Sequence, residues 1–184
     1  MSELDHLVVA ARSLEEGAAW VESKLGVAPV AGGKHPLMGT HNRLLKLDAR
    51  RFLEVIAIDP DAPAPPRPRW FELDAPAMHS RLARGPALVH WVERTDDLEA
   101  AVRAGREDVE IIAFTRGPYR WRMGVTRDGS FPGGGERATL IQWEGGLHPW
   151  TALPETGVSL LEFHPRLPDL RATFVAPSGS RTIP

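Results

Sequence analysis

An internal repeat constrains the fold of this chain more than any other feature of its sequence. An apolar segment with a central histidine occurs twice, and the copies are Asp5-His6-Leu7-Val8-Val9 and, 84 residues later, Val89-His90-Trp91-Val92-Glu93. The same shift aligns Leu14 with Leu98, and both lie in segments with the pattern of an amphipathic helix. Two copies of one unit that cannot bury their own apolar faces are expected to pack together, with His6 and His90 at equivalent positions.

The first copy begins with a strand and a helix. Residues 4–10 alternate as expected for a strand, and His6 lies on one of its two faces. Ser13 is the predicted N-cap of the helix, with Glu16 three residues later as in a capping box, and Gly26 is its predicted end.

Three further strands complete the first copy. Residues 27–30 are predicted to form a short strand that runs into a glycine-rich turn over residues 32–42. Residues 42–47 and 52–58 are predicted to form a hairpin. The first module is therefore expected to have the order strand, helix, strand, strand, strand.

The same order is predicted after a proline-rich segment, because prolines in residues 59–69 remove the backbone donors that a sheet or helix needs. The resulting organisation is one compact α+β domain, in which two βαβββ modules form cupped mixed sheets around a central cleft. Its parts are a first module (1–60), a linker with a short helix (61–85), a second module (86–150) and a C-terminal strand and hairpin extension (151–184).

Composition excludes several classes of protein. A net charge of −2 and the lack of a long basic run give no electrostatic footprint for nucleic acid. The absence of cysteine excludes disulfides, thiol nucleophiles and cysteine-ligated zinc. No apolar run approaches the roughly 20 residues of a membrane span, and the N-terminus lacks the pattern of a signal peptide. We therefore expect a cytoplasmic protein without a membrane or nucleic-acid partner.

Several motifs resemble a known superfamily. Paired βαβββ modules with a histidine on the first strand and a carboxylate on the last are typical of the vicinal oxygen chelate superfamily, which this chain resembles. The motifs that resemble its glyoxalase-like branch are Gly32-Gly33-Lys34-His35, Gly39-Thr40-His41-Asn42-Arg43-Leu44, Phe52-Leu53-Glu54, Leu140-Ile141-Gln142-Trp143 and His148-Pro149. The resemblance covers nearly the whole chain and is strongest over the first 60 residues.

The resemblance implies a metal site in the cleft between the modules. Imidazole nitrogens with carboxylate or amide oxygens suit a divalent ion such as Zn, Ni, Mn or Fe, and leave positions open for substrate. By position the ligands would be His6 and Glu54 from the first module, and His90 and Gln142 from the second. Glu162 has the same local surroundings as Glu54 and competes with Gln142 for the fourth place.

Structural roles remain open for these residues. His6 and His90 could instead be half-buried strand histidines with backbone partners. Glu54 has apolar strand neighbours, where an ionised carboxylate is costly unless it is paired or ligated. On an edge strand that faces solvent, that argument would not apply.

Six residues are candidates for contacts with substrate. The glycine-framed turn and the strand after it carry His35, His41 and Asn42, which could hydrogen-bond a substrate or satisfy the backbone of the turn itself. In the second module, Arg122 could bind an anion and Trp143 could form an apolar wall, or they could be a surface arginine and a core tryptophan. His148, which precedes Pro149 and is therefore expected to be extended, could lie at the rim of the cleft or simply shape the crossover.

The resemblance implies a metal-dependent lyase, isomerase or dioxygenase acting on a small molecule with two adjacent oxygens. Glu54 could then also relay a proton as a catalytic residue. The alternative is a non-catalytic protein that binds or sequesters a small molecule in a tryptophan-lined cleft, since the chain has six tryptophans. Either protein could be a homodimer.

Overall fold

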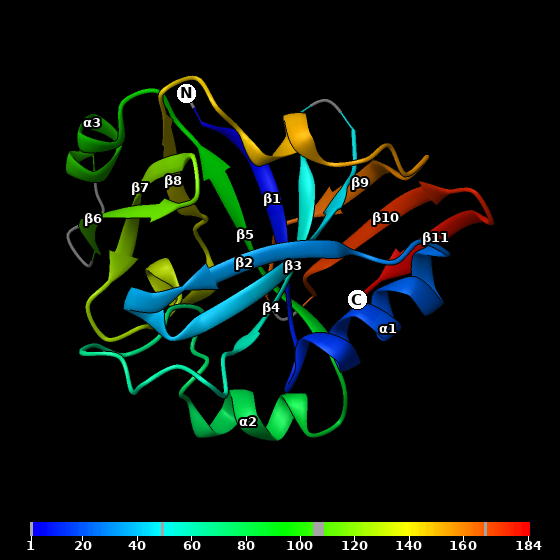
Figure 1. Ribbon diagram of the computed structural model, residues 1–184, viewed down its shortest axis with the longest axis horizontal. Helices are drawn as coiled ribbons and strands as arrows, with labels where there is room; N and C mark the ends of the chain where they lie inside the picture. The colour runs from blue at the N-terminus through cyan, green and yellow to red at the C-terminus, as the bar shows by residue number, and fades with distance from the viewer. Residues whose placement is uncertain (1, 49, 105–108, 168) are drawn as a thin grey trace.

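The strands of the two modules form one continuous, strongly curled sheet. The computed structural model describes residues 2–48, 50–104, 109–167 and 169–184. The first module comprises β1 (Glu3–Ala10), α1 (Leu14–Leu25), β2 (Val30–His35), β3 (Thr40–Lys46) and β4 (Phe52–Ile58). The second comprises β5 (Ala87–Arg94), α3 (Leu98–Arg103), β6 (Val109–Arg116), β7 (Tyr119–Thr126) and β8 (Thr139–Glu144). The strand order is β2-β3-β4-β1-β5-β8-β7-β6, as Figure 1 shows.

The pairing of β1 with β5 joins the modules and relates them by an approximate two-fold axis. Leu7 pairs with Trp91, and Val8 pairs with His90, which is the residue 84 positions after His6. An antiparallel register of this kind follows when a two-fold axis passes between Leu7 and Trp91. The repeat predicted from the sequence is therefore confirmed, with His6 and His90 at equivalent positions.

A β-bulge interrupts the pairing at each end of this central register. Leu4 pairs with Glu93 and His6 with Val92, so Asp5 is an extra residue on β1. The equivalent extra residue on β5 is Val89, between His90 and Leu88. A bulge re-aims the side chain that it carries, and that change of direction determines where the Asp5 carboxylate lies.

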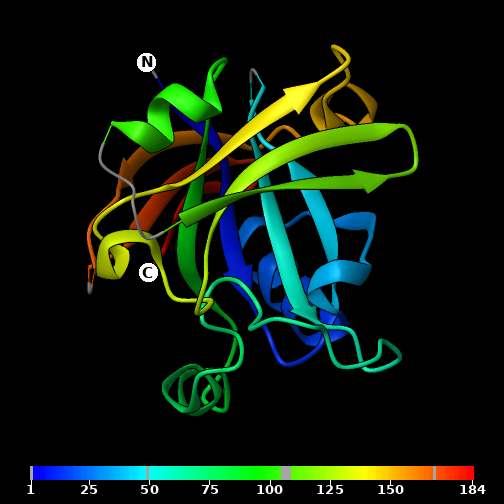
Figure 2. The same cartoon turned by 90° about the vertical axis from the view of Figure 1, so that its left-hand side faces the viewer.

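The sheet separates two apolar cores. On its outer face, α1 and a second, three-stranded sheet pack over β1 and β4. That sheet consists of β9 (Ser159–His164), β10 (Arg171–Ala176) and β11 (Gly179–Ile183), with β10 in the centre. On the inner face, aromatic side chains of β6 and β7 pack against β1, β4 and β8. Figure 2 shows how the strands of the second module cross over those of the first.

The helix boundaries predicted for α1 are confirmed, because the Ser13 hydroxyl accepts a hydrogen bond from Glu16 N (3.2 Å) and Gly26 adopts a left-handed φ of 75°. The linker residues 59–69 contain neither helix nor strand, and the short helix that follows is α2 (Pro76–Leu82). Among the described residues, no helix is long and apolar enough to cross a membrane.

The predicted strand over 27–30 and the glycine-rich turn are wrong. Strand β2 begins at Val30 and includes Gly32 and Gly33, and the chain reverses instead at a short helix, Pro36–Met38, followed by Gly39 with a φ of 57°. Position 32 of this strand requires glycine, because a Cβ there would come within 2.1 Å of the Asn42 side chain. The glycines therefore permit close packing inside the sheet.

Gly17 allows α1 to approach β4, the strand that carries Glu54. A Cβ at Gly17 would lie 2.4 Å from Val55 Cγ1 and 2.9 Å from Ala11 Cβ. Replacement of glycine by alanine in an unconstrained helix stabilises by about 1 kcal/mol, whereas overpacking a core costs about 1–3 kcal/mol. We expect Gly17→Ala to lower the free energy of unfolding by up to about 2 kcal/mol in urea denaturation, and Ser23→Ala on the exposed side of α1 to change it little. A more stable Gly17→Ala protein would contradict this packing.

Candidate active site

The inner face of the curled sheet encloses a small cavity with polar and aromatic walls. Its polar residues are His6, His35, Asn42, Glu54 and Arg116. Its apolar residues are Leu44, Phe52, Trp70, Phe71, Trp121, Met123, Ile141 and Trp143. They come from all strands of the large sheet except β5, together with the segment that precedes α2. The cavity volume is about 30 Å³.

Asp5 fixes the position of His6 from behind the cavity wall. One Asp5 oxygen lies 2.7 Å from His6 Nδ1, and the other accepts hydrogen bonds from Trp143 Nε1 (3.0 Å) and His148 Nε2 (2.9 Å). The backbone N–H of Trp150 donates to His148 Nδ1 (3.1 Å), so the hydrogen of neutral His148 is on Nε2 and points to Asp5. Asp5 is fully buried, and each of its carboxylate oxygens has a hydrogen-bond partner within the protein.

These donors keep Asp5 ionised. Burial alone would raise the pKa of Asp5, but the hydrogen bonds from His148 and His6 outweigh it and hold this pKa well below its usual range. An ionised Asp5 accepts a hydrogen bond from His6 Nδ1. The other ring nitrogen of His6, Nε2, then points toward the cavity. Such a carboxylate sets both the orientation and the tautomer of an imidazole.

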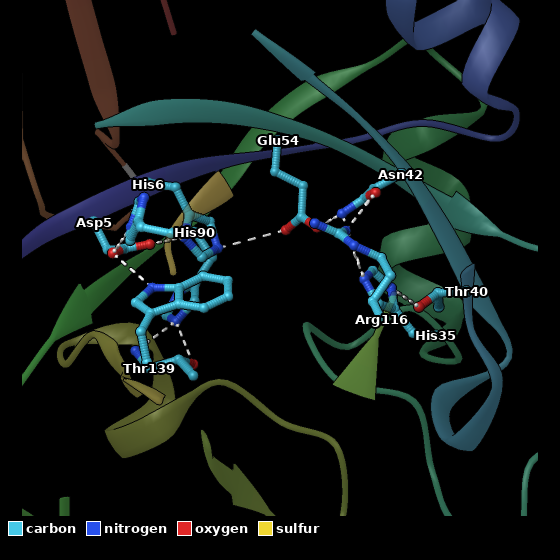
Figure 3. Close-up of polar contacts among 11 residues, drawn as sticks. Asp5, His6, His35, Thr40, Asn42, Glu54, His90, Arg116 and Thr139 are labelled. Atoms are coloured by element: carbon cyan, nitrogen blue, oxygen red, sulfur yellow. Dashed lines mark hydrogen bonds and ion pairs between the residues drawn. The ribbon is translucent and has the colours of Figure 1, made fainter. Parts of the chain in front are cut away.

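Glu54 faces His6 across the cavity. His6 Nε2 lies 3.6 Å from Glu54 Oε2, while Asn42 Nδ2 donates to Glu54 Oε1 (2.6 Å). Figure 3 shows Glu54 between His6 on one side and Asn42 with Arg116 on the other. A carboxylate and an imidazole at this separation can share a proton or pass one to a bound molecule.

Asn42 connects Glu54 to a cationic group. Its Oδ1 accepts hydrogen bonds from Arg116 Nη1 (3.0 Å) and from Gly33 N (2.9 Å). Its Nδ2 also lies 3.4 Å from His35 Nε2. The amide is thus bonded on both sides, which fixes its orientation.

His35 is an uncharged member of this network. Burial, and then the charge of Arg116, lower the pKa of His35 to about 3. Its Nδ1 lies 3.1 Å from Thr40 Oγ1, and its Nε2 lies 3.5 Å from Arg116 Nη1. Because Arg116 can only donate, His35 Nε2 accepts and Nδ1 carries the hydrogen.

Gln142 and Arg122 do not reach the cavity, contrary to the prediction. Trp121, Met123, Ile141 and Trp143 line the cavity, and side chains alternate along a strand, so the residues between them point to the outer face. There Gln142 Oε1 accepts hydrogen bonds from Leu98 N (2.9 Å) and Arg122 Nη2 (3.1 Å). Arg122 also pairs with Glu99 and with Glu144.

Thr139, rather than Gln142, occupies the position equivalent to Glu54. Val8 on β1 pairs with Glu54, and Val92, 84 residues later, pairs with Thr139. The Thr139 hydroxyl lies 3.0 Å from His90 Nε2, and its backbone N–H donates to the same nitrogen (3.2 Å). The second module therefore retains the histidine and carries a hydroxyl in place of the carboxylate.

The other predicted residues are divided between the cavity and its surroundings. His35, Asn42 and Trp143 line it, whereas His41 lies on the opposite side of β3, with Nδ1 4.0 Å from Asp59. His148 is buried behind Asp5 and does not form a rim. Glu162 is exposed on β9 and pairs with His164 (3.0 Å).

Sequence reasoning missed Asp5 and Arg116. Strict alternation along β1 places Asp5 on the outer face with Leu7, and only the bulge turns it toward His6. Arg116 ends an edge strand 74 positions from Asn42, to which it donates. The one signal in the sequence that could have indicated Arg116 is its basic side chain at the end of a mostly apolar strand.

A comparison with protein families identifies the chain. The family described as glyoxalase-like domain matches residues 4–176. The protein belongs to this family. A search of curated proteins finds no match.

Several solved structures are similar to this glyoxalase-like protein at low sequence identity. A hypothetical protein from Staphylococcus aureus is 12% identical, with 99% of this chain and 84% of that chain covered and a TM-score of 0.56. Methylmalonyl-CoA epimerase from Mycobacterium tuberculosis is 19% identical over 76% of this chain and 85% of its own, with a TM-score of 0.46. A variant of the Streptomyces coelicolor epimerase, in complex with 2-nitronate-propionyl-CoA, is 14% identical over 80% and 98%, with a TM-score of 0.47.

Members of the superfamily commonly use divalent metals, and the four ligands predicted here lie in different surroundings. His6 and Glu54 face the same space, but His90 Nε2 is bonded to Thr139, and Gln142 lies on the outer face. Within the described ranges, no three His, Cys, Asp or Glu side chains are grouped as an ion would require. The residues present do not fit the predicted four-ligand site.

The low pKa of His35 predicts acid sensitivity. A histidine whose pKa is about 3 in the folded protein and 6.5 when unfolded binds its proton only on unfolding between these values, so stability falls as the pH falls below 6.5. We expect His35 to account for a loss of about 2 kcal/mol in the free energy of unfolding between pH 6.5 and about pH 4.5. Denaturation of wild type and His35→Gln at both pH values measures it. Equal pH dependence of the two proteins would show that His35 is not the cause.

The ligand geometry predicts weak metal binding. After dialysis, we expect well below one equivalent of Zn, Ni, Mn or Fe by elemental analysis, and no rise in melting temperature when these ions are added. One equivalent that a chelator removes, and that His6→Ala or Glu54→Ala abolishes, would contradict this expectation.

Proposed function

We propose that this glyoxalase-like protein is an enzyme that transfers a proton on a small, oxygen-bearing substrate, with His6 and Glu54 as the acid–base pair. The observation that supports this most is the buried series Asp5, His6 and Glu54, in which the last two face one cavity at 3.6 Å. A structural role alone does not require two proton-carrying groups to converge on an enclosed space.

The proposed step removes a proton from a carbon next to a carbonyl group. One Glu54 oxygen takes the proton, the electron pair of the broken C–H bond moves toward the carbonyl, and the carbonyl oxygen gains negative charge. A doubly protonated His6, whose Nδ1–H is held by Asp5, stabilises that oxygen through its Nε2–H or transfers that proton to it. Return of the proton to another position would make the enzyme an isomerase, and loss of a neighbouring group would make it a lyase.

The surroundings of the pair favour this chemistry. The ionised Asp5 carboxylate lies against His6 Nδ1 and accepts its hydrogen bond, so that Nε2 stays turned toward the cavity. The aromatic walls of the cavity, including Phe52 stacked on His6 at 4.5 Å, leave little room for water. Electrostatic interactions between the pair and a substrate are stronger in such an environment than in bulk water.

The aromatic walls also favour a second candidate function. Trp70, Trp121 and Trp143 line the same cavity, and aromatic surface of this kind supports binding of a small molecule without any reaction. A binding protein of this fold would retain its ligand unchanged, so the two functions differ in whether substrate protons exchange.

Proton exchange with solvent tests the enzymatic function. In D₂O, NMR would follow the protons next to the carbonyl in a panel of small 2-oxo acids, 2-hydroxy ketones and 1,3-dicarbonyl compounds. We expect exchange of at least one compound above the background rate, and a loss of about 100-fold or more in Glu54→Gln, as is usual when a general base is removed.

The matched control is Glu162→Gln, the same substitution at an exposed glutamate outside the cavity. It should exchange substrate at the wild-type rate. No exchange on any compound, or full exchange by Glu54→Gln, would contradict the proposed function.

A further inference from the structure

The cavity contains a partly buried positive charge without a carboxylate in contact. Arg116 reaches it from the end of β6, and its Nη1 donates to Asn42 Oδ1 (3.0 Å) and lies 3.5 Å from His35 Nε2. Both acceptors are neutral. Within the described part of the chain, no carboxylate oxygen lies within 4.0 Å of the guanidinium.

From this arrangement we infer that Arg116 is the anion receptor of the cavity and that the substrate carries a carboxylate. The inference rests on the proposed function, of which it specifies the substrate class. Removing a charge from water is costly unless the charge is paired, and the partly buried Arg116 contacts only neutral polar partners, Asn42 and His35. A guanidinium presents two parallel N–H groups that match the two oxygens of a carboxylate.

The nearest carboxylate of the protein is kept away from Arg116. Asn42 lies between Arg116 and Glu54, bonded to both, so cation and anion act at opposite ends of one amide group. A direct Arg116–Glu54 pair would neutralise the receptor and occupy the base. The inserted amide keeps both groups available to a ligand.

The same arrangement indicates where the substrate reacts. A carboxylate on Arg116 would direct the adjoining carbon toward Glu54, because only the Asn42 amide separates the two groups. The carbon that loses its proton is then one or two bonds from the carboxylate. The substrate class is a short carboxylic acid with a carbonyl beside it, such as a 2-oxo acid.

Gly33 provides the space for the Arg116 side chain. A Cβ on Gly33 would lie 2.4 Å from Arg116 Cδ and 3.0 Å from Cγ. Gly33 is not among the residues with positive φ, so alanine is compatible with its backbone, and the clash with Arg116 is the main effect expected. Gly33→Ala would therefore displace the guanidinium without removing its charge.

Binding of a matched pair of probes tests the inference. Pyruvate and its amide have nearly the same shape and differ in charge, and fluorescence of Trp70, Trp121 and Trp143 would report their entry into the cavity. At constant ionic strength, we expect pyruvate to bind wild type at least about tenfold more tightly than pyruvamide. Arg116→Met should abolish this preference, and Gly33→Ala should reduce it.

The control is Arg120→Met, the same substitution at an exposed arginine on the neighbouring strand, which should keep the preference. Melting curves establish that each variant is folded. Equal binding of the two probes by wild type, or a preference that Arg116→Met retains, would overturn the assignment of Arg116.

Glu54→Gln separates this inference from the proposed function. It should still prefer pyruvate, because Arg116 is unchanged and a nearby negative charge is gone. Proton exchange without a carboxylate preference would overturn the receptor and leave the proposed enzyme intact. A carboxylate preference without exchange on any compound would support the receptor and overturn the enzymatic function.

Discussion

The structure depends on the antiparallel pairing of β1 with β5, where Leu7 faces Trp91. This contact makes one sheet from two modules, and its twist and curl create the inner face on which the cavity lies. Its register also determines which side chains point inward. A slip by one residue would move His6 to the outer face, and the bulge at Asp5 depends on the same register.

The sequence was sufficient to predict the internal repeat and most of the helix and strand order of the first module. The repeat drew attention to His6, and the resemblance and apolar strand neighbours drew attention to Glu54; the structure places the two side chains 3.6 Å apart. Ser13 and Gly26 could be predicted because helix caps act locally. Gln142 was misplaced because the hairpins were aligned across a longer loop, and an error of three residues reverses the face of a strand. Asp5 escaped detection because its partners, Trp143 and His148, are distant in sequence.

Neutral side chains hold the charged side chains of the cavity in position. Asn42 uses its oxygen toward Arg116 and its nitrogen toward Glu54, while His35, uncharged because of its burial, accepts from the same side. On the other side of Glu54, Asp5 orients His6. An amide with every polar atom bonded has a single orientation, so the spacing between anion and cation is a property of the folded protein before any ligand enters.

The equivalence of Thr139 and Glu54 has a consequence for how such a site can evolve. In a dimer of identical single modules, each substitution occurs in both halves, and a catalytic carboxylate could not be lost from one half alone. Covalent linkage of the two halves removes this constraint. One half of this chain carries the proposed acid–base pair, and in the other half His90 and Thr139 serve packing and mutual hydrogen bonding.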